Sequence, residues 1–234
     1  PVRLARKLRN SDRALGAITT DDLNRVFEWM EKDRAVPCSP KTLARRITST
    51  KSFFRWLHAH GVLTIDPAEN VLQRSAISPL PQVLTDDEYE ATLLASDRHR
   101  RDPKPDARSY TLLYLLLTTG IKKSECLGIH INHIDLEAKE GPQVFIRYAS
   151  PSNRYKERKL TLPDDWIPAY EEYLAQYNPV DRLFPWSPRR LEYLLEDIGK
   201  EAGLTKHLSF DMCRWTSALL DNLNNVEAEK IRQK

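Results

Sequence analysis

The residues best placed to do chemistry follow an apolar helix near the middle of the chain. Residues 110–129 open as an apolar run, break at Thr118-Thr119-Gly120 and resume as Lys122-Lys123-Ser124-Glu125. Glycine often ends a helix because it adopts the left-handed conformation without strain. A buried helix that stops at a glycine and is followed by a charged helix start holds polar side chains rigidly. The pattern therefore predicts that the turn, with its charged residues, forms the floor of a cleft.

A second set of polar residues lies on a long helix predicted over residues 41–60, after the start signal Ser39-Pro40 and before Gly61. Its apolar face holds Leu43, Ile47, Phe54 and Leu57, and Phe53 and Trp56 are expected to widen it. Another part of its surface carries cations with small hydroxyls between them, which are side chains that bind phosphates: Lys41, Arg45, Thr48, Lys51, Ser52 and Arg55. This surface is interpreted either as a DNA-contacting face or as the solvated face of an ordinary amphipathic helix.

A third set of cations borders a predicted β-hairpin. Residues 144–148 and 159–162 have strand character, and Ser150-Pro151-Ser152-Asn153 separates them. The rim of the hairpin is basic, with Arg154, Lys156, Arg158 and Lys159.

Composition excludes several classes of protein. At 41% hydrophobic and 29% charged residues the chain has an ordinary globular composition. Its longest apolar run, Leu112 to Leu117, is far shorter than the roughly 20 residues that span a bilayer. The first residues, PVRLARKLRN, lack the apolar core of a secretion signal. The three cysteines form no CxxC pair and indicate reduced thiols. We therefore expect a cytoplasmic protein, associated with the nucleoid and not with a membrane.

The distribution of charge, together with a proline-rich linker signal and a helix-start signal, divides the chain in two. Residues 1–75 carry a net charge of +6 and the remaining 159 residues a net of −3. A basic module suits phosphate binding. Ser78-Pro79-Leu80-Pro81 is typical of a linker, and Thr85-Asp86-Asp87-Glu88 is a capping box. We expect a helical DNA-binding domain over residues 1–78 and a second domain over residues 84–234.

The remaining pattern predicts a mainly α fold with a small β-hairpin or three-stranded sheet. A helix is expected to start at Thr20-Asp21-Asp22. Further helices are predicted over residues 66–72, 86–96, 163–177, 187–202 and 209–223, with a last start at Val226.

Three motifs, in this order after a small basic helical domain, resemble the tyrosine recombinase (phage integrase) family: TTGIKKSECLGI, YKERKLTLP and SFDMCRWTSALL. The resemblance implies a SAM-like DNA-binding domain followed by a recombinase catalytic domain. It also implies site-specific DNA cleavage and rejoining, as in DNA integration by mobile elements. In that chemistry a tyrosine hydroxyl attacks a phosphodiester without a metal or cofactor. Double-stranded DNA is the implied partner, and the family acts as tetramers on two DNA sites.

The resemblance assigns roles to particular residues. Arg214 stands at the position of the family's second catalytic arginine, and Glu125 at that of the acidic residue three places after the first. The spacing of three places Lys122 and Glu125 on one side of a helix. Lys156 is our candidate for the hairpin lysine that acts as general acid, with Arg154 or Lys159 as alternatives. Arg154 and Lys159 are also assigned to DNA contact.

Three departures from the family's pattern affect the expected chemistry. Lys122 stands at the first arginine, and a lysine keeps the charge but lacks the bidentate fork. Asp211 stands where the family has His or Lys, and an ionised carboxylate repels a phosphate. No tyrosine follows Arg214 in the sequence. His130 and His133 have no further ligands in the sequence pattern, so no metal site is expected.

Three hypotheses follow from these assignments. The first is an active recombinase whose nucleophilic tyrosine lies beyond residue 234. The second is a non-catalytic DNA-binding relative that acts as a regulator, an architectural factor or an assembly partner. The third is a helical interaction module with an accidental resemblance.

Overall fold

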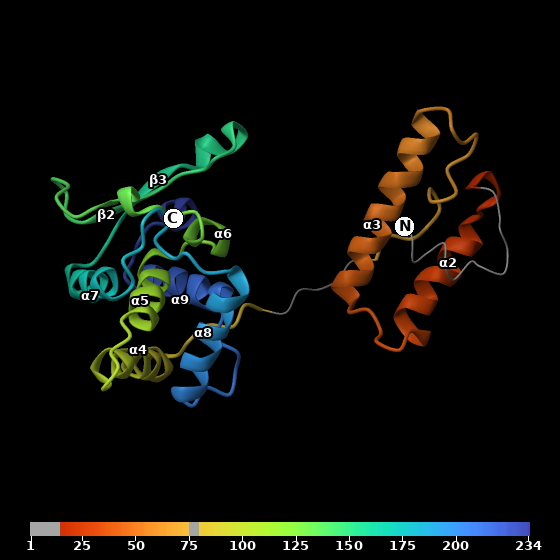
Figure 1. The fold of residues 1–234 in the computed structure, drawn as a ribbon. Coiled ribbons are helices and arrows are strands. Elements are labelled where there is room, and N and C mark those ends of the chain that lie inside the picture. The colour runs from red at the N-terminus through yellow and green to blue at the C-terminus, as the bar shows by residue number, and fades with distance from the viewer. Residues whose placement is uncertain (1–14, 75–79) are drawn as a thin grey trace. The chain divides into compact units, whose positions relative to one another are not determined.

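The chain divides into two compact units, Pro1–Leu80 and Pro81–Lys234, and each is described by itself (Figure 1). The structure is a computed structural model that describes residues 15–74 and 80–234. In these ranges no helix is both long enough and apolar enough to cross a membrane. The assignment of the two units as a DNA-binding and a catalytic domain stays a prediction.

The N-terminal unit is a small helical assembly. Its elements are a 3-10 turn (Leu15–Ala17), α2 (Thr20–Glu28), a π-helical turn (Trp29–Asp33) and α3 (Pro40–Ala59). Thr19 caps α2: its hydroxyl accepts from the backbone N–H of Asp22 at 3.2 Å, and the Asp22 carboxylate accepts from Thr19 N at 3.0 Å. The capping box therefore begins one residue before the predicted start at Thr20.

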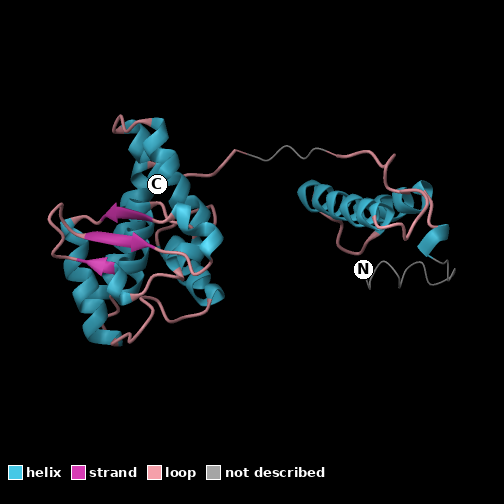
Figure 2. Cartoon of the chain, turned by 90° about the horizontal axis from the view of Figure 1, so that it is seen from above, coloured by secondary structure: helices cyan, strands magenta, loops and turns pink. Residues whose placement is uncertain are grey.

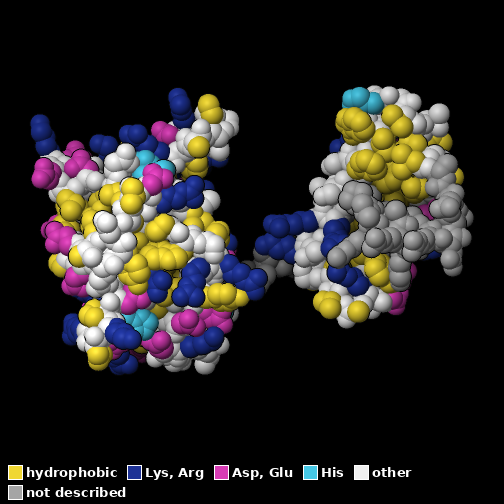
Figure 3. Space-filling model, viewed as in Figure 1, with side chains coloured by type: hydrophobic (Ala, Val, Ile, Leu, Met, Phe, Trp, Pro, Cys, Tyr) yellow, Lys and Arg dark blue, Asp and Glu magenta, His cyan; other side chains and the backbone are white. Residues whose placement is uncertain are grey.

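The core of this unit uses a narrower face of α3 than the sequence predicted. The apolar face is buried as expected, with Leu43, Ile47, Phe54 and Leu57 at 5% exposure or less. Phe53 and Trp56, however, are 49% and 54% exposed, so the prediction that they widen the buried face is wrong. Hydrophobic side chains consequently gather at the surface near the C-terminal end of α3 (Figure 3).

The segment after α3 is held by polar contacts instead of a helix of its own. Residues 67–70 form turns, so the helix predicted over residues 66–72 is wrong. The carboxylate of Asp66 accepts from Ala68 N at 2.8 Å and closes a local turn. Lys51 Nζ donates to the carbonyls of Glu69 at 3.1 Å and Val71 at 2.6 Å, which fastens the segment to α3.

The C-terminal unit is built around α5 (Arg108–Thr119). Five of its leucines are at most 1% exposed: Leu112, Leu113, Leu115, Leu116 and Leu117. A helix that is apolar on all sides must be covered on all sides. The covering helices are α4 (Asp86–Arg101), α7 (Ile167–Tyr177), α8 (Pro188–Glu201) and α9 (Phe210–Leu223).

A three-stranded antiparallel sheet lies at one side of this unit, with α4 on the opposite side (Figure 1). Its strands follow the order β1 (Ile134–Asp135), β2 (Gln143–Ile146) and β3 (Arg158–Thr161), and Figure 2 shows them lying across the helices. The predicted fold, mainly α with a small three-stranded sheet, is confirmed. The shorter elements are α6 (Lys123–Cys126), α10 (Ala228–Gln233) and three 3-10 turns (Ile131–His133, Pro151–Lys156 and Asp164–Trp166).

The register of β2 and β3 decides which hairpin residues face inward. Val144 pairs with Leu160, and Ile146 pairs with Arg158. Val144 and Ile146 are buried, and side chains alternate between the two faces of a strand. Arg158 and Leu160 therefore face the core, whereas Lys159 lies on the exposed face of the sheet.

The end of α5 depends on Gly120. This residue has a φ of +61°, and its N–H donates to Leu116 O at 3.0 Å. A Cβ at this position would lie 3.1 Å from Ser217 Oγ and 3.3 Å from Ser217 Cβ on α9. Glycine therefore serves both the left-handed turn and the close approach of α9.

We predict that Gly120→Ala lowers the free energy of unfolding by about 2–4 kcal/mol, because backbone strain and a steric clash add. Gly203→Ala is the matched control in the same unit: its φ is +75° and nothing lies within 4 Å of its Cβ position. It should cost only the strain, about 1–2 kcal/mol. Urea unfolding measures both, and equal losses would contradict the role of the α9 contact.

Candidate active site at the turn after α5

The buried carboxylate of Glu125 is the centre of the predicted site. Its side chain is 0% exposed. Arg158 donates to it through both arms of the guanidinium, Nη1 to Oε1 and Nη2 to Oε2, each at 3.0 Å. The backbone N–H of Lys122 donates to Oε2 at 2.8 Å, and the Tyr148 hydroxyl donates to Oε1. All of these donors point at one carboxylate, which is how a buried charge is tolerated.

The electrostatics of Glu125 result from two opposed effects. Burial alone would raise its pKa, because desolvation disfavours the charged form. The hydrogen bonds from Arg158, Tyr148 and the Lys122 backbone outweigh burial and lower the pKa to about 2. Burial and the bond to Glu125 raise the pKa of Tyr148 above its usual range. Glu125 is therefore an anion at neutral pH that anchors the hairpin to the turn.

Arg214 forms the second link to the turn. Its Nη1 donates to Gly120 O at 3.1 Å, and Ser217 packs against the same glycine one helical turn further along α9. Arg214 is half-buried. The sheet, α9 and the end of α5 thus meet at residues 120–125, which brings together Lys122, Glu125 and Arg214 from the predicted set.

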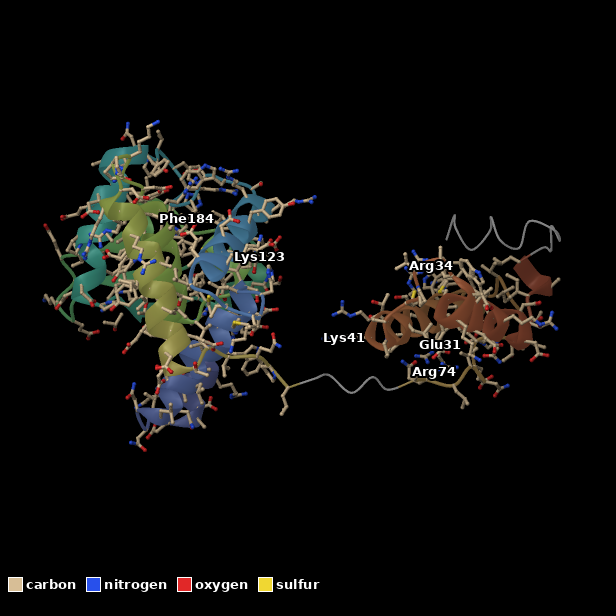
Figure 4. The ribbon with its side chains drawn as sticks, turned by 90° about the horizontal axis from the view of Figure 1, so that it is seen from below. Glu31, Arg34, Lys41, Arg74, Lys123 and Phe184 are labelled. Carbon is tan, nitrogen blue, oxygen red and sulfur yellow. The ribbon has the colours of Figure 1, made fainter. Side chains whose placement is uncertain are left out.

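Lys122 presents its side chain to solvent. Its backbone is fixed by the bond to Glu125, but its ammonium has no hydrogen bond or ion pair with any residue that the structure describes. The neighbouring Lys123 is instead paired with Glu192 at 2.7 Å, and Figure 4 labels its position on this unit. The turn therefore offers one unpaired cation, Lys122, two residues beyond the carbonyl that Arg214 holds.

Asp211 lies on the wall of a neighbouring cleft. It is an exposed residue in the first turn of α9, which Ser209 caps. The cleft is open and has a volume of about 770 Å³; its other lining residues include Lys123, Arg189, Glu192, Tyr193 and His207. Within the described residues no hydrogen bond or ion pair joins Asp211 to Lys122 or Arg214.

The hairpin cations divide into two groups. Lys156 Nζ donates to Asn153 Oδ1 at 3.0 Å and lies 5.1 Å from the Tyr155 ring centroid, so it stays on its own 3-10 turn. Arg154 and Lys159 are exposed. Arg158, which was not assigned a role, is the hairpin residue that reaches the turn. The sequence did contain a signal for this. Arg158 is spaced by two residues from the apolar Leu160, as Leu160 is from Leu162, so on a strand all three side chains lie on the same, inward face.

The DNA-contact residues predicted on α3 divide into those with free side chains and those with bonded side chains. Four of these residues are exposed, and their side chains have no hydrogen-bonding or ionic partner among the described residues: Lys41, Arg45, Ser52 and Arg55. Figure 4 shows Lys41 extending from the end of the helix. Thr48 donates to Ala44 O at 3.0 Å and accepts from Gln73 Nε2 at 2.9 Å. Lys51 is bound to two carbonyl oxygens, so its ammonium already has a structural role.

In residues 15–74 and 80–234, no three His, Cys, Asp or Glu side chains gather in a group that could hold a metal ion. His130 instead pairs with Asp181 at 2.7 Å.

Comparison with known proteins agrees with the geometry. The model of the phage integrase family matches residues 82–229. The tyrosine recombinase XerC of Roseiflexus castenholzii is 34% identical over 157 residues, which are 67% of this chain and 46% of that protein. XerD of Caulobacter vibrioides is 30% identical over 183 residues, 72% of this chain and 57% of that protein. Among solved structures, XerH bound to a palindromic difH substrate in a post-cleavage complex has a TM-score of 0.80 at 18% identity. That match covers 99% of this chain and 69% of the XerH chain.

The chain belongs to the phage integrase family, the tyrosine recombinases. It matches about half the length of the first two relatives, 46% and 57%. The family match covers the turn, the hairpin and α9, which are the three parts that meet at Glu125 and Arg214.

We predict that Arg158→Gln lowers the free energy of unfolding by about 3–5 kcal/mol, because it leaves the buried Glu125 carboxylate without its counter-ion. Glu125→Gln combined with Arg158→Gln should cost less than the sum of the two single changes. Arg101→Gln is the control, since Arg101 is 79% exposed and its pair with Asp97 should contribute at most about 1 kcal/mol. Equal losses in Arg158→Gln and Arg101→Gln would contradict the anchoring role.

The same variants should differ in their acid response. The folded pKa of Glu125, about 2, lies below the value of roughly 4.3 expected in the unfolded chain. Its stabilisation is therefore complete above that unfolded value and is lost as the pH falls towards 2. Arg158→Gln should reduce this part of the acid-induced loss, measured as the free energy of unfolding between pH 5 and pH 2.

Proposed function

We propose that this protein is a site-specific DNA recombinase of the tyrosine class, which binds duplex DNA and cleaves and rejoins strands through a tyrosine beyond Lys234. It would assemble as a tetramer on two DNA sites. The observation that carries the proposal is the junction at residues 120–125. There a buried ion pair and the Arg214–Gly120 bond fix the turn, while the Lys122 ammonium stays free for a phosphate.

The chemistry would proceed by in-line transfer at a DNA phosphate. The tyrosine oxygen forms a bond to phosphorus as the bond from phosphorus to the 5′ oxygen breaks, and the tyrosine loses its proton. Charge that develops on the non-bridging oxygens would be stabilised by Arg214 and Lys122. Lys156 would protonate the departing 5′ oxygen after leaving Asn153. Reversal of the step by another strand's 5′ hydroxyl would rejoin the DNA.

A second candidate function is that of a DNA-binding relative that does not cleave. Two features favour it: Lys122 cannot form the bidentate contact of an arginine, and Asp211 places a carboxylate in the cleft that Lys123 also lines. Such a protein would act as a regulator, an architectural factor or an assembly partner. The two functions share DNA binding and differ in covalent chemistry.

We predict that the full-length protein forms a covalent adduct with a nicked suicide DNA substrate. The adduct should survive denaturing electrophoresis, form in EDTA, and disappear when the C-terminal tyrosine is replaced by phenylalanine. Absence of an adduct, together with salt-sensitive binding, would reject the recombinase and support the second candidate.

Variants at the turn test the assignment of the cations. Lys122→Arg should raise the rate of adduct formation about 10–100-fold, because a fork adds a charge-assisted hydrogen bond of roughly 1.5–3 kcal/mol. Arg214→Ala should lower the rate by about 10²–10³-fold. The control Arg101→Ala, on the α4 side of the unit (Figure 1), should change it less than about twofold. An unchanged rate in Lys122→Arg would show that Lys122 does not contact the reacting phosphate.

The exposed cations of α3 lead to a separate prediction for the salt dependence of DNA binding. Arg45→Ala and Arg55→Ala should each reduce the slope of log K against log salt by about 0.9, the effect of one lost phosphate contact. Arg46→Ala is the control on the same helix, because Arg46 faces Met30, with Nη1 at 3.6 Å from Sδ. Lys51→Met should lower stability instead, since it removes the bonds to Glu69 and Val71. Equal slopes in all four variants would reject this face as the DNA contact.

A further inference from the structure

Lys234 is tied to α9 through its side chain. Its Nζ lies 2.7 Å from Asp221 Oδ2 and donates to Ser217 Oγ at 3.1 Å. The side chains of Lys234 and Asp221 are only 23% and 20% exposed, so this ion pair is largely shielded from solvent. Shielding strengthens a charge pair and makes the loss of either partner costly.

The backbone of Lys234 is tied to the hairpin. Its carbonyl accepts from Arg158 Nε at 2.7 Å, while both Nη atoms of Arg158 hold Glu125. The same guanidinium therefore joins Lys234 to the buried carboxylate of the turn. Lys234 thus contacts two of the three parts that meet at the candidate active site, α9 and the hairpin.

The geometry of α9 places these contacts close to Gly120. Arg214, Ser217 and Asp221 follow each other at spacings of three and four, so they share one face of the helix. Arg214 bonds the Gly120 carbonyl, Ser217 packs against Gly120, and Asp221 and Ser217 hold the Lys234 ammonium. The row runs from the candidate phosphate site to the end of α10.

The helix α10 itself, which ends one residue before Lys234, forms few shielded contacts of its own. The helix has six residues, none of them buried. Its other ion pairs, Lys230 with Glu227 and Arg232 with Glu229, are local, and their side chains are 57–78% exposed. A helix this short is not stable by itself in water. Its position must therefore come from contacts with the rest of the unit, and among the ion pairs of residues 227–234 that of Lys234 with Asp221 is the most shielded.

We infer that Lys234 is a positioning residue, which locks α10 onto α9 and the hairpin and fixes the direction of the chain that follows relative to Arg214. The consequence for catalysis rests on the proposed function, in which the nucleophilic tyrosine belongs to that following chain. Loss of the Lys234–Asp221 pair releases α10 without removing any cation assigned to DNA contact. The pair therefore acts on the strand-cleavage step and not on DNA affinity.

The test compares full-length variants by hydrogen exchange of residues 226–234 and by adduct formation on the suicide substrate. Lys234→Met and Asp221→Asn should each raise exchange in this segment at least fivefold and leave α5 unchanged. Both should slow adduct formation at least tenfold, with DNA affinity within twofold of the wild type. The charge swap Asp221→Lys with Lys234→Asp should recover at least half of each effect. If the swap does not fold, Lys234→Arg provides the variant that keeps the charge.

Lys230→Met is the matched control, because it removes a lysine from α10, the helix that Lys234 follows, and the side chain of Lys230 is 70% exposed. Exchange in Lys234→Met equal to that in Lys230→Met would overturn the lock. Faster exchange with an unchanged rate of adduct formation would overturn the positioning role. If the wild type forms no adduct, the proposed strand cleavage is wrong. Hydrogen exchange of residues 226–234, and its recovery in the charge swap, would still test whether the Lys234–Asp221 pair holds α10 in place.

Discussion

The bond between Glu125 and Arg158 constrains the whole C-terminal unit. A carboxylate with no exposed surface is stable only if its charge is matched, and the guanidinium fork matches both oxygens. The two residues are 33 positions apart, so the pair requires the β3 strand to lie against the turn after α5. The same carboxylate accepts the Lys122 N–H, which fixes how the backbone leaves α5. Arg158 also donates to the backbone oxygen of Lys234, the residue that follows α10.

Local signals in the sequence were enough to predict most of the fold. The capping box at Thr85 to Glu88 and the apolar run that ends at Gly120 identified α4 and α5, since both signals act within a few residues. Two predictions that depended on contacts between residues far apart in the sequence were wrong. Trp56 is of a residue type that is often buried, but it is 54% exposed. The helix expected over residues 66–72 is absent, because Asp66 and Lys51 satisfy its backbone groups in turns.

The site could be predicted in part, for a related reason. Motif order selected Lys122, Glu125 and Arg214 as site residues, and the structure brings these three to one junction through Gly120 and Glu125, while their roles stay a prediction. It did not identify the partner of Glu125. Four cations between residues 154 and 159 look alike in the sequence, and only the pairing of Ile146 with Arg158 separates the one that faces inward. Lys156 was favoured as a motif residue, yet it bonds to Asn153 on its own turn. Strand parity would have indicated Arg158 as the inward-facing hairpin cation, whereas the role of Lys156 as general acid stays a prediction.

The residues that hold the site together are different from those that depart from the family's pattern. The junction is formed by contacts among four residues: Glu125, Arg158, Gly120 and Arg214. Lys122 and Asp211 are exposed, and their side chains form no hydrogen bond or ion pair in the described part of the chain. Substitution at these two exposed positions is therefore expected to cost the fold little. Family membership rests on the match over residues 82–229, whereas the proposed strand cleavage would also depend on the exposed side chain of Lys122, which the contacts of the junction leave free.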